Sequence, residues 1–316
     1  MLWERFIAYL QGMTMEIRQL RYFIAVAEAG HITRAAERLD MQQPPLSRQI
    51  KAIERELDVQ LFYRMARGVE LTDAGRAFLD RARSILASMD SAFDATRSMA
   101  RGEQGRISVG VMPTGPFHPF VPRIIRKFRE KFPMVTLMLD ESLSTDLIER
   151  VGNGQMDVAF IRTTRFDAEH IAITSLLNEP MIVALPHDHE FAQKKGDQSV
   201  TMKQLAGEAF ILYGMPGSGT YDSTIAACSA AGFTPRISQQ ALRVPSCLGL
   251  VAVGLGIALV PESIQRTHMD GVAYRRIKGP VVPTARLSLA SRRGERSAVV
   301  RNFLGLVRSA AKSMRS

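Results

Sequence analysis

The sequence predicts a multidomain chain: an N-terminal all-α winged helix-turn-helix, then a long linker helix, then a C-terminal α/β domain. Three observations predict this fold. Residues 20–75 have the pattern of three short helices followed by a β-hairpin. Residues 78–99 carry apolar side chains every seven positions, as coiled-coil helices do. From residue 106 onward, strand patterns alternate with helix patterns, which is typical of α/β domains.

The first two helices are predicted from apolar spacing and from residues that end or begin a helix. In the first helix the apolar positions recur at i, i+3, i+4 and i+7, as Leu20, Phe23, Ile24 and Ala27. Gly30 is expected to end this helix. Thr33 is predicted to cap a second helix over residues 34–39, whose exposed amides suit a DNA phosphate.

The third helix has the features of a helix that enters the DNA major groove. It opens with Pro44 and Pro45, which a first turn tolerates because the N–H groups there have no helical partner. Its buried stripe is predicted to be Leu46, Ile50, Ile53 and Leu57. The side chains that lie largely off that stripe are Gln43, Ser47, Arg48 and Lys51. In the major groove, Arg suits the O6 and N7 atoms of guanine, and Gln suits adenine in the same way.

A β-hairpin is predicted next, from alternating residues 60–64, a turn at 66–68 and a return strand at 69–71. It places Arg64 and Arg67 near its tip, within reach of the sugar-phosphate backbone or an adjacent minor groove. The alternative is that the Arg and Lys side chains of this region are solvated charges without a partner. Two ordered helices, a proline-started third helix and a basic hairpin together favour DNA binding.

Residues 15–75 resemble the winged helix-turn-helix of LysR-type transcriptional regulators. The motif RAAERL…QQPPLSRQIKAIERELDVQLFYR…GVELTDAG matches that family nearly throughout, with small departures at His31 and Tyr63. The resemblance implies contacts with double-stranded DNA by Thr33, Gln43, Pro44, Ser47, Arg48, Lys51, Arg64 and Arg67. Residues 1–14 lie outside the family pattern, either as an extension or as the product of an upstream start codon.

The long helix is predicted to run from a cap at Thr72 to about Arg101, roughly 40 Å at 1.5 Å per residue. Its seven-residue repeat is Phe78, Ile85, Ala92 and Met99, and Leu79, Leu86 and Phe93 broaden the apolar stripe. Such a stripe needs a partner, which favours a dimer; packing within one chain is the alternative. The family resemblance implies a homodimer through this helix, commonly assembled into a homotetramer. In a dimer, the two reading helices (the third helix of each protomer, which would read the DNA bases) are related by a two-fold axis and would match an inverted-repeat operator. Residues 102–105 are expected to be a hinge.

The C-terminal region is predicted to form repeated βα units. The predicted strands are 107–111, 135–140, 157–161, 181–185, 210–213, 236–239, 257–260 and 286–291, and the predicted helices are 119–132, 145–153, 220–232, 246–253 and a last one from Glu295. Repeated βα units predict parallel sheets with helices on both faces. Ligands of such sheets bind beyond the carboxyl ends of the strands, beside helix N-termini.

That rule selects a set of hydroxyl side chains. Thr114 follows the first strand. Three further groups each lie at the start of a predicted helix: Ser144 with Thr145, residues 218–220, and Ser246. Each offers a hydroxyl beside free backbone amides, which suits a carboxylate, and Arg162 at a strand end adds a possible two-pronged contact. The alternative is that each Ser or Thr only caps its helix, which is the commonest role of such residues.

The family resemblance extends more loosely over this region. It implies a periplasmic-binding-protein-like effector domain, residues 104–316, whose subdomains I (104–176 and 281–316) and II (177–280) enclose a ligand. Residues 15–72 would then form the DNA-binding domain and residues 73–103 the linker. By position, Thr114, Ser144 and Arg162 match effector contacts in family members that sense small carboxylates, including aromatic acids. The implied effector is a small organic anion, with no cofactor and no metal.

Composition limits the other function classes. The net charge is +10, and residues 275–316 carry eleven Lys and Arg against Glu295 alone, so the excess charge lies away from the third helix. It supports DNA binding only in a general way. The chain lacks a membrane-length apolar run and a signal-peptide pattern, so a cytoplasmic location without membrane contact is expected. Cys228 and Cys247 are expected to be buried and unreactive, with a redox switch as the alternative.

The sequence contains no catalytic pattern, so no enzyme activity is expected. The glycine-rich residues 214–220 have Thr where a phosphate-binding loop requires Lys, and His187 with His189 lies in a polar turn typical of solvated side chains. The sequence therefore predicts a ligand-responsive, sequence-specific transcriptional regulator, with RNA polymerase as a partner. Judged on the βα region alone, a solute-binding protein or an enzyme would be the alternatives.

Overall fold

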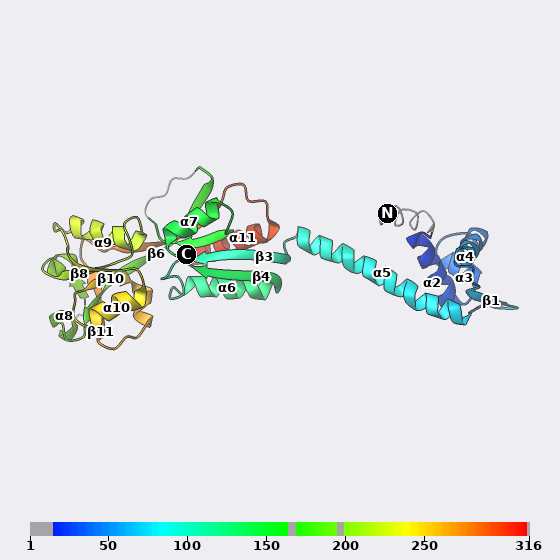
Figure 1. The fold of residues 1–316 in the computed structure, drawn as a ribbon, viewed down its shortest axis with the longest axis horizontal. Helices are drawn as coiled ribbons and strands as arrows, with labels where there is room; N and C mark the ends of the chain where they lie inside the picture. The colour runs from blue at the N-terminus through cyan, green and yellow to red at the C-terminus, as the bar shows by residue number, and fades with distance from the viewer. Residues whose placement is uncertain (1–14, 164–168, 195–198, 315–316) are drawn as a thin grey trace, which may run out of the picture. The chain divides into compact units, whose positions relative to one another are not determined.

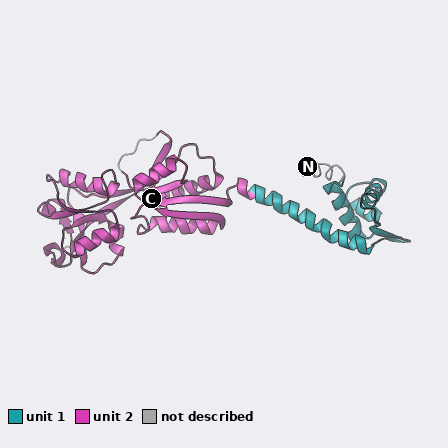
Figure 2. Cartoon of the chain, in the orientation of Figure 1, with its two compact units in different colours: residues 1–97 teal, residues 98–316 magenta. Residues whose placement is uncertain are grey.

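The computed structural model describes residues 15–163, 169–194 and 199–314. The predicted extension, residues 1–14, lies outside the described residues. The chain forms two compact units, residues 1–97 and 98–316 (Figure 2).

The first unit contains three helices followed by a hairpin, as the sequence predicts. The helices are α2 (Ile17–Ala29), α3 (Ile32–Arg38) and α4 (Gln43–Leu57), and the hairpin strands are β1 (Phe62–Met65) and β2 (Gly68–Leu71). Their shared core is centred on Phe23, whose ring lies 5.2 Å from that of Phe62 and 4.9 Å from that of Phe78. Gly30 ends α2 in the left-handed conformation, with φ 61°, which glycine adopts without a steric cost.

Two details of these helices differ from the prediction. The cap of α3 is His31, whose Nδ1 accepts the backbone amide of Thr33 at 3.2 Å. Thr33 therefore lies inside the first turn and does not cap it, because the extended backbone at His31 brings the imidazole to the amide that a capping hydroxyl would bond. In α4 the buried stripe ends at Ile53, and Leu57 is 38% exposed because the chain leaves the helix at Asp58.

The long helix α5 (Asp73–Ala100) begins at the predicted cap. The Thr72 hydroxyl accepts the Gly75 amide at 2.8 Å and donates to the Gln60 carbonyl at 2.8 Å. Near this end Ala82 is buried in the core of the first unit. Farther along, the apolar side chains of Ile85, Phe93 and Met99 are 49%, 52% and 60% exposed. No described residue covers this part of the predicted stripe.

The second unit is built on an eight-stranded sheet in the order β4-β3-β5-β12-β6-β11-β7, with β10 paired to β6. These strands are β3 (Gln104–Val111), β4 (Met134–Glu141), β5 (Val158–Ile161), β6 (Ile171–Pro186), β7 (Ser199–Thr201), β10 (Ala258–Pro261), β11 (Val272–Lys278) and β12 (Thr284–Arg292). Two further strands, β8 (Ala209–Tyr213) and β9 (Arg236–Ala241), form a separate parallel pair.

The prediction of parallel sheets is right at the edges and wrong at the centre. β3 runs parallel to β4 and to β5, as in βα units. β12, however, is antiparallel to both β5 and β6, and β10 and β11 are antiparallel to β6. Antiparallel neighbours need no crossover helix between them, so the alternation of strands and helices along the chain does not reveal this arrangement.

Separate hydrophobic cores lie at the two ends of this sheet. Subdomain I is the part around β3, β4 and β5, with α6 (Phe120–Lys131), α7 (Ser144–Gly152) and α11 (Ala298–Ser313). There α7 lies on one face of the sheet and α6 on the other (Figure 1). Subdomain II is the part around β8 and β10, with α8 (Glu190–Gln193), α9 (Gly219–Ala230), α10 (Val244–Ala252) and the 3-10 helices η1 (Met202–Leu205) and η2 (Glu262–Arg266).

The chain passes between the subdomains on β6 and β12. Leu176 and Leu287 belong to the core of subdomain I, whereas Met181 and Ala285 belong to a core of subdomain II. The register shifts between Leu287 and Ser288, where β6 holds one extra residue. Such a bulge bends a strand and increases its twist, so β6 and β12 bend close to the point where they cross between the two subdomains.

Gly102, in the predicted hinge, is buried against the start of α11. A Cβ at this position would lie 2.5 Å from the Ala298 carbonyl carbon. The Asn302 amide also donates to the Arg101 carbonyl at 2.9 Å and to the Gly102 carbonyl at 3.2 Å. The next strand, β3, already begins at Gln104, so these residues are held against the second unit.

Candidate functional site

The residues predicted to read DNA lie on the outer face of α4. Leu46, Ile50 and Ile53 anchor the helix in the core of the first unit. On the opposite side Pro44, Arg48 and Lys51 are exposed, and Gln43 and Ser47 are half-buried. Thr33 is exposed on the neighbouring helix α3. The basic and amide side chains are therefore presented to solvent by a helix whose other face is fixed.

Glu54, which no sequence motif marks as functional, fastens the hairpin to α4. Glu54 Oε1 accepts the backbone amides of Leu61 at 2.9 Å and Phe62 at 3.2 Å. A surface groove of about 640 Å³ runs beside this contact and includes Arg48 and Lys51 among its lining residues. Glu54 thus sets the position of the hairpin relative to the reading face of α4.

The hairpin carries its two arginines at and beside its tip. Met65 pairs with Gly68 at the end of the ladder, which leaves Arg67 in the turn and Arg64 one position farther from the tip. Both arginine side chains are exposed. Gly68 has φ 118°, and a Cβ there would lie 2.4 Å from the Gly30 carbonyl oxygen. Only glycine fits this close approach, which holds the hairpin against the end of α2.

Three residues predicted to bind an effector, Thr114, Ser144 and Arg162, lie together in the second unit. The Arg162 side chain is 2% exposed and follows β5. Its Nε donates to the Thr114 hydroxyl at 3.1 Å, and its backbone amide donates to the Ser144 hydroxyl at 3.0 Å. Its terminal nitrogens donate to the Ala285 carbonyl at 2.7 Å and to the Glu179 carboxylate. Among the described residues, three of its five N–H groups therefore have an acceptor.

These residues line a small cavity between the two subdomains. The lining residues are Met112, Pro113, Thr114, Leu143, Ser144 and Arg162 from subdomain I and Tyr213, Gly214, Ser218, Thr220 and Leu242 from subdomain II. Its volume is about 30 Å³, which is the space of about one water molecule. The Ser218 hydroxyl is buried with no partner among the described residues. Burial raises the pKa of Tyr213, so its phenol stays protonated and can donate a hydrogen bond.

The structure does not bring two of the predicted effector residues to this cavity. Thr145 is exposed, and its hydroxyl donates to Asp146 Oδ1 at 3.2 Å. Ser246 is exposed in the first turn of α10, because that helix begins two residues earlier than predicted, at Val244. Glu179 is the important residue that the prediction missed. It lies in the part of β6 that precedes the predicted strand 181–185, and its local sequence gives no sign that it is buried.

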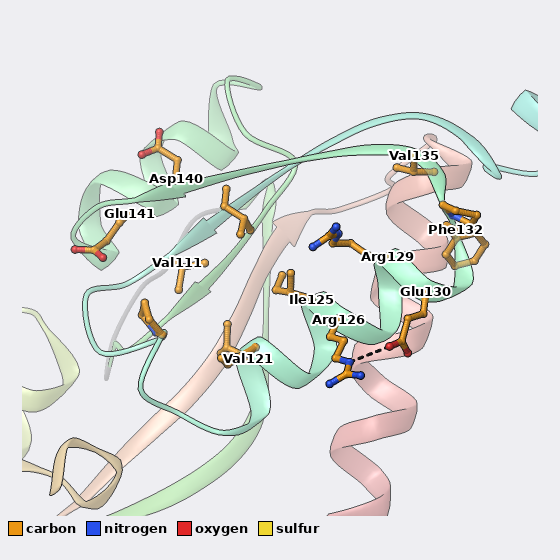
Figure 3. Close-up of a pocket in the computed structure, with 14 residues that line it drawn as sticks. Val111, Val121, Ile125, Arg126, Arg129, Glu130, Phe132, Val135, Asp140 and Glu141 are labelled. Atoms are coloured by element: carbon orange, nitrogen blue, oxygen red, sulfur yellow. Dashed lines mark hydrogen bonds and ion pairs between the residues drawn. The ribbon is translucent and has the colours of Figure 1, made fainter. Parts of the chain in front are cut away.

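A larger groove lies on the surface of subdomain I (Figure 3). It measures about 910 Å³ and runs between α6 and β4, with Val121, Ile125 and Val135 on its apolar side. Arg126 beside it is already paired with Glu130 at 2.9 Å. The groove is bigger than the cavity at Arg162, yet it contains none of the predicted effector residues. We favour the smaller cavity because convergent buried polar groups, more than volume, mark a binding site.

The two cysteines are buried in subdomain II. Burial raises the pKa of Cys228 to about 11 and that of Cys247 to about 12. Both thiols are therefore protonated near neutral pH and poor nucleophiles. Among the described residues, no cluster of three or more His, Cys, Asp or Glu side chains could hold a metal ion. None of the helices in the described part of the chain has the length and apolar character needed to cross a membrane.

Comparison with known families matches both units. Residues 17–76 match the family described as "Bacterial regulatory helix-turn-helix protein, lysR family". Residues 100–312 match the family described as "LysR substrate binding domain". The second match alone spans more than half of the chain.

Individual relatives match over nearly their full length. The HTH-type transcriptional regulator BudR of Raoultella terrigena is 34% identical, over 92% of this chain and 99% of its own. CatR of Pseudomonas putida is 36% identical, over 94% of this chain and 100% of its own. The crystal structure of CbnR, a LysR family transcriptional regulator, has a TM-score of 0.82 and is 32% identical, over 93% of this chain and 100% of its own.

A second CbnR structure, of the full-length protein complexed with its target DNA, has a TM-score of 0.80 and is 32% identical, over 94% of this chain and 100% of its own. These relatives are transcriptional regulators, in agreement with the expectation that the chain is not an enzyme. The winged helix-turn-helix, the exposed face of α4 and the two-subdomain α/β unit agree with the same conclusion. The chain belongs to the LysR family of bacterial helix-turn-helix transcriptional regulators.

Proposed function

We propose that this LysR-type regulator responds to a small carboxylate bound in the cavity between its subdomains. The observation that carries the proposal is that a buried guanidinium and two helix N-termini converge there. Ser144 and Thr220, in the first turns of α7 and α9, both line the cavity with Arg162. The first N–H groups of a helix lack helical partners and carry partial positive charge, so they favour an anion.

The hydrogen bonds of Arg162 support the same proposal. Thr114 and Ala285 hold the guanidinium in a fixed orientation. Burial lowers the pKa of Arg162 while the Glu179 carboxylate raises it, and an arginine remains charged in either case. Two of its five N–H groups have no acceptor among the described residues, so a bound anion could accept charge-assisted hydrogen bonds from a guanidinium that is already held in place.

The size of the cavity supports a mechanism in which binding moves the subdomains. A volume of about 30 Å³ is too small for an aromatic acid, so entry of the effector must widen the space between subdomain I and subdomain II. The movement would bend β6 and β12 at their bulge and change how the protomers of an oligomer place their reading helices on DNA. Allosteric coupling of this kind typically amounts to about 1–3 kcal/mol.

On the DNA side, α4 is proposed to enter the major groove, where Gln43, Ser47 and Arg48 reach base edges. Lys51, Arg64 and Arg67 would contact the backbone. The exposed apolar residues of α5 are proposed to join two protomers into a dimer. The two α4 helices of the dimer would then fit an inverted repeat, and two such dimers would form a tetramer. RNA polymerase is the proposed partner at the promoter, and the cytoplasm, where bacterial DNA lies, is the proposed location.

Calorimetric titration of the full-length protein tests the carboxylate proposal. The probes are benzoate, succinate and adipate, with benzamide as the neutral analogue of benzoate. We expect at least one carboxylate to bind and benzamide to bind at least about tenfold more weakly, since it lacks the charge that Arg162 and the helix N-termini stabilise. Equal affinity for benzoate and benzamide, or binding by none of the three acids, would count against the proposal.

A further inference from the structure

A second buried charge lies directly behind the cavity. Glu179 is 7% exposed and lies in β6 between Leu176, in the core of subdomain I, and Met181, in a core of subdomain II. It follows the bulge at which the pairing of β6 with β12 shifts. A carboxylate buried at the crossing point between two subdomains needs compensation by charge and by hydrogen bonds.

The two oxygens of Glu179 hold groups from different subdomains. Oε2 accepts from the Arg162 guanidinium, and the His118 imidazole Nε2 lies 3.8 Å from the same oxygen. Oε1 accepts the Ser263 backbone amide at 2.5 Å. Arg162 follows β5 and His118 precedes α6, both of subdomain I, whereas Ser263 belongs to η2 of subdomain II. One side chain therefore ties the guanidinium of the cavity to an element on the other side of the crossing point.

We propose that Glu179 is a positioning residue that couples Arg162 in the cavity to the crossing point between the subdomains. When an anion binds at Arg162, His118 takes up a proton. The inference rests on the proposed function, because it assumes that the cavity takes a carboxylate. Beyond the proposed function, it gives a role to Glu179, which does not line the cavity, and it links effector binding to proton uptake by the protein.

The charges around His118 give the reason for proton uptake. The charged groups that face it are Glu179 on β6, Arg162 after β5 and Arg266 on η2. Burial lowers the pKa of His118, the nearby guanidinium groups lower it further, and Glu179 raises it. An anion beside Arg162 offsets one of the two positive charges and leaves Glu179 with less compensation. Both changes favour the protonated imidazole.

The position of the proton also follows from the contacts. His118 Nδ1 accepts the Phe120 amide, the first amide of α6, at 3.1 Å. The neutral ring must therefore carry its proton on Nε2, on the side of Glu179. A second proton would go to Nδ1 and end the bond with Phe120, while the charged ring would gain a stronger attraction to Glu179. Proton uptake would thus also alter the first turn of α6.

The sign of the pH dependence is fixed by this scheme. His118 is expected to have a higher pKa in the complex than in the free protein. Its protonation then adds full affinity below its pKa in the free protein, and this added affinity is lost as the pH rises through its pKa in the complex. The dissociation constant of a carboxylate should therefore increase with pH, by up to about tenfold per pH unit, across a window that begins at the lowered pKa of His118 in the free protein, below the ordinary 6.5, and ends at its higher pKa in the complex. Benzoate is fully ionised above about pH 6 and contributes no pH dependence of its own there, whereas the second carboxyl groups of succinate and adipate still titrate at about pH 5–6, so the affinities of these two probes are referred to their dianions.

The experiment is calorimetric titration of the full-length protein with benzoate, succinate and adipate across this pH range. Glu179→Gln keeps the shape of the side chain but removes the charge that favours the imidazolium, so the pH dependence should disappear. His118→Gln removes the titrating group and serves the same purpose if Glu179→Gln fails to fold. His268→Gln is the matched control, because His268 is exposed and should leave the wild-type pH profile unchanged.

The outcomes separate this inference from the proposed function. If a carboxylate binds the wild-type protein with the same affinity at every pH, or if His118→Gln keeps the wild-type slope, the coupling is wrong while the effector site stands. If no carboxylate binds the wild-type protein, the proposed function fails and the coupling fails with it. A falling affinity with rising pH, abolished in both variants and kept in His268→Gln, is the expected result.

Discussion

The Nε atom of Arg162 donates to the hydroxyl of Thr114 at 3.1 Å, although 48 positions separate the two residues in the chain. Both side chains are almost completely buried, at 2% exposure each. Thr114 therefore orients the guanidinium, and under the proposed function it also offers its own hydroxyl to the carboxylate in the cavity. A conservative change at this position should affect both protein stability and effector binding.

Thr114→Val keeps the shape of the side chain and removes its hydroxyl. Leaving a buried guanidinium N–H without its acceptor should lower the free energy of unfolding by about 1–3 kcal/mol. Carboxylate affinity should fall by roughly tenfold, because one hydrogen bond to the anion is lost. Denaturant unfolding and calorimetric titration measure the two effects. Thr145→Val is the control, since Thr145 is exposed outside the cavity; an equal loss of binding in the two variants would refute the assignment.

Arg48→Ala tests whether α4 reads bases. If Arg48 contacts a guanine, specific DNA binding should weaken by about 1–3 kcal/mol, and discrimination at one base-pair position should relax. Arg67→Ala, at the hairpin tip, should reduce affinity for every sequence alike, because a phosphate contact carries no base information. Competition binding with single-position operator variants distinguishes the two patterns. A uniform loss for Arg48→Ala would mean that Arg48 contacts a phosphate.

The exposed part of α5 should hold the oligomer together. Phe93 is 52% exposed on the apolar stripe, so Phe93→Glu should shift the protein towards monomers by placing a charge in an apolar contact. Ser91→Glu puts the same charge on another exposed position of the helix and should leave the oligomeric state unchanged. Analytical ultracentrifugation over a range of concentrations measures both. An unaltered sedimentation profile for Phe93→Glu would place the subunit contact elsewhere.

The cysteines should be slow to react in the folded protein. Since burial raises the pKa of Cys228 to about 11 and of Cys247 to about 12, the thiolate forms only above those values and is scarce near neutral pH. Iodoacetamide should label both residues quickly in denaturant and only slowly without it, as followed by mass spectrometry. Rapid labelling of the native protein would instead favour a redox-active thiol.

The DNA-binding unit could be predicted from the sequence because local signals dominate it. The two prolines that start α4 and the spacing of Leu46, Ile50 and Ile53 are properties of a short segment. The exception is the cap of α3. His31 and Thr33 both have a side chain that can accept a backbone amide, and the residue preferences at helix caps favour threonine. Which of the two bonds the amide depends on the backbone angles at His31, which the sequence does not reveal.

The residues that line the cavity at Arg162 were predicted only in part, because the cavity depends on contacts between distant segments. The rule that ligands bind at strand ends selected Thr114, Ser144 and Arg162, which the structure brings together. It also selected Thr145, but adjacent helical residues point about 100° apart, so Ser144 faces the cavity and Thr145 does not. Glu179 stayed hidden because the run Asn178-Glu179-Pro180 breaks the apolar pattern of β6, and only the distant Arg162 explains why a carboxylate is buried there.

The most direct test of the central claim is a footprint on the DNA upstream of the protein's own gene, with competitor DNA present. The titration should be run without ligand and then with a saturating carboxylate from the set that binds. We predict a protected inverted repeat whose extent or bend changes when the carboxylate is added. Protection that is identical with and without ligand would contradict effector control. Diffuse protection that disappears with salt would contradict sequence-specific reading by α4 at this DNA.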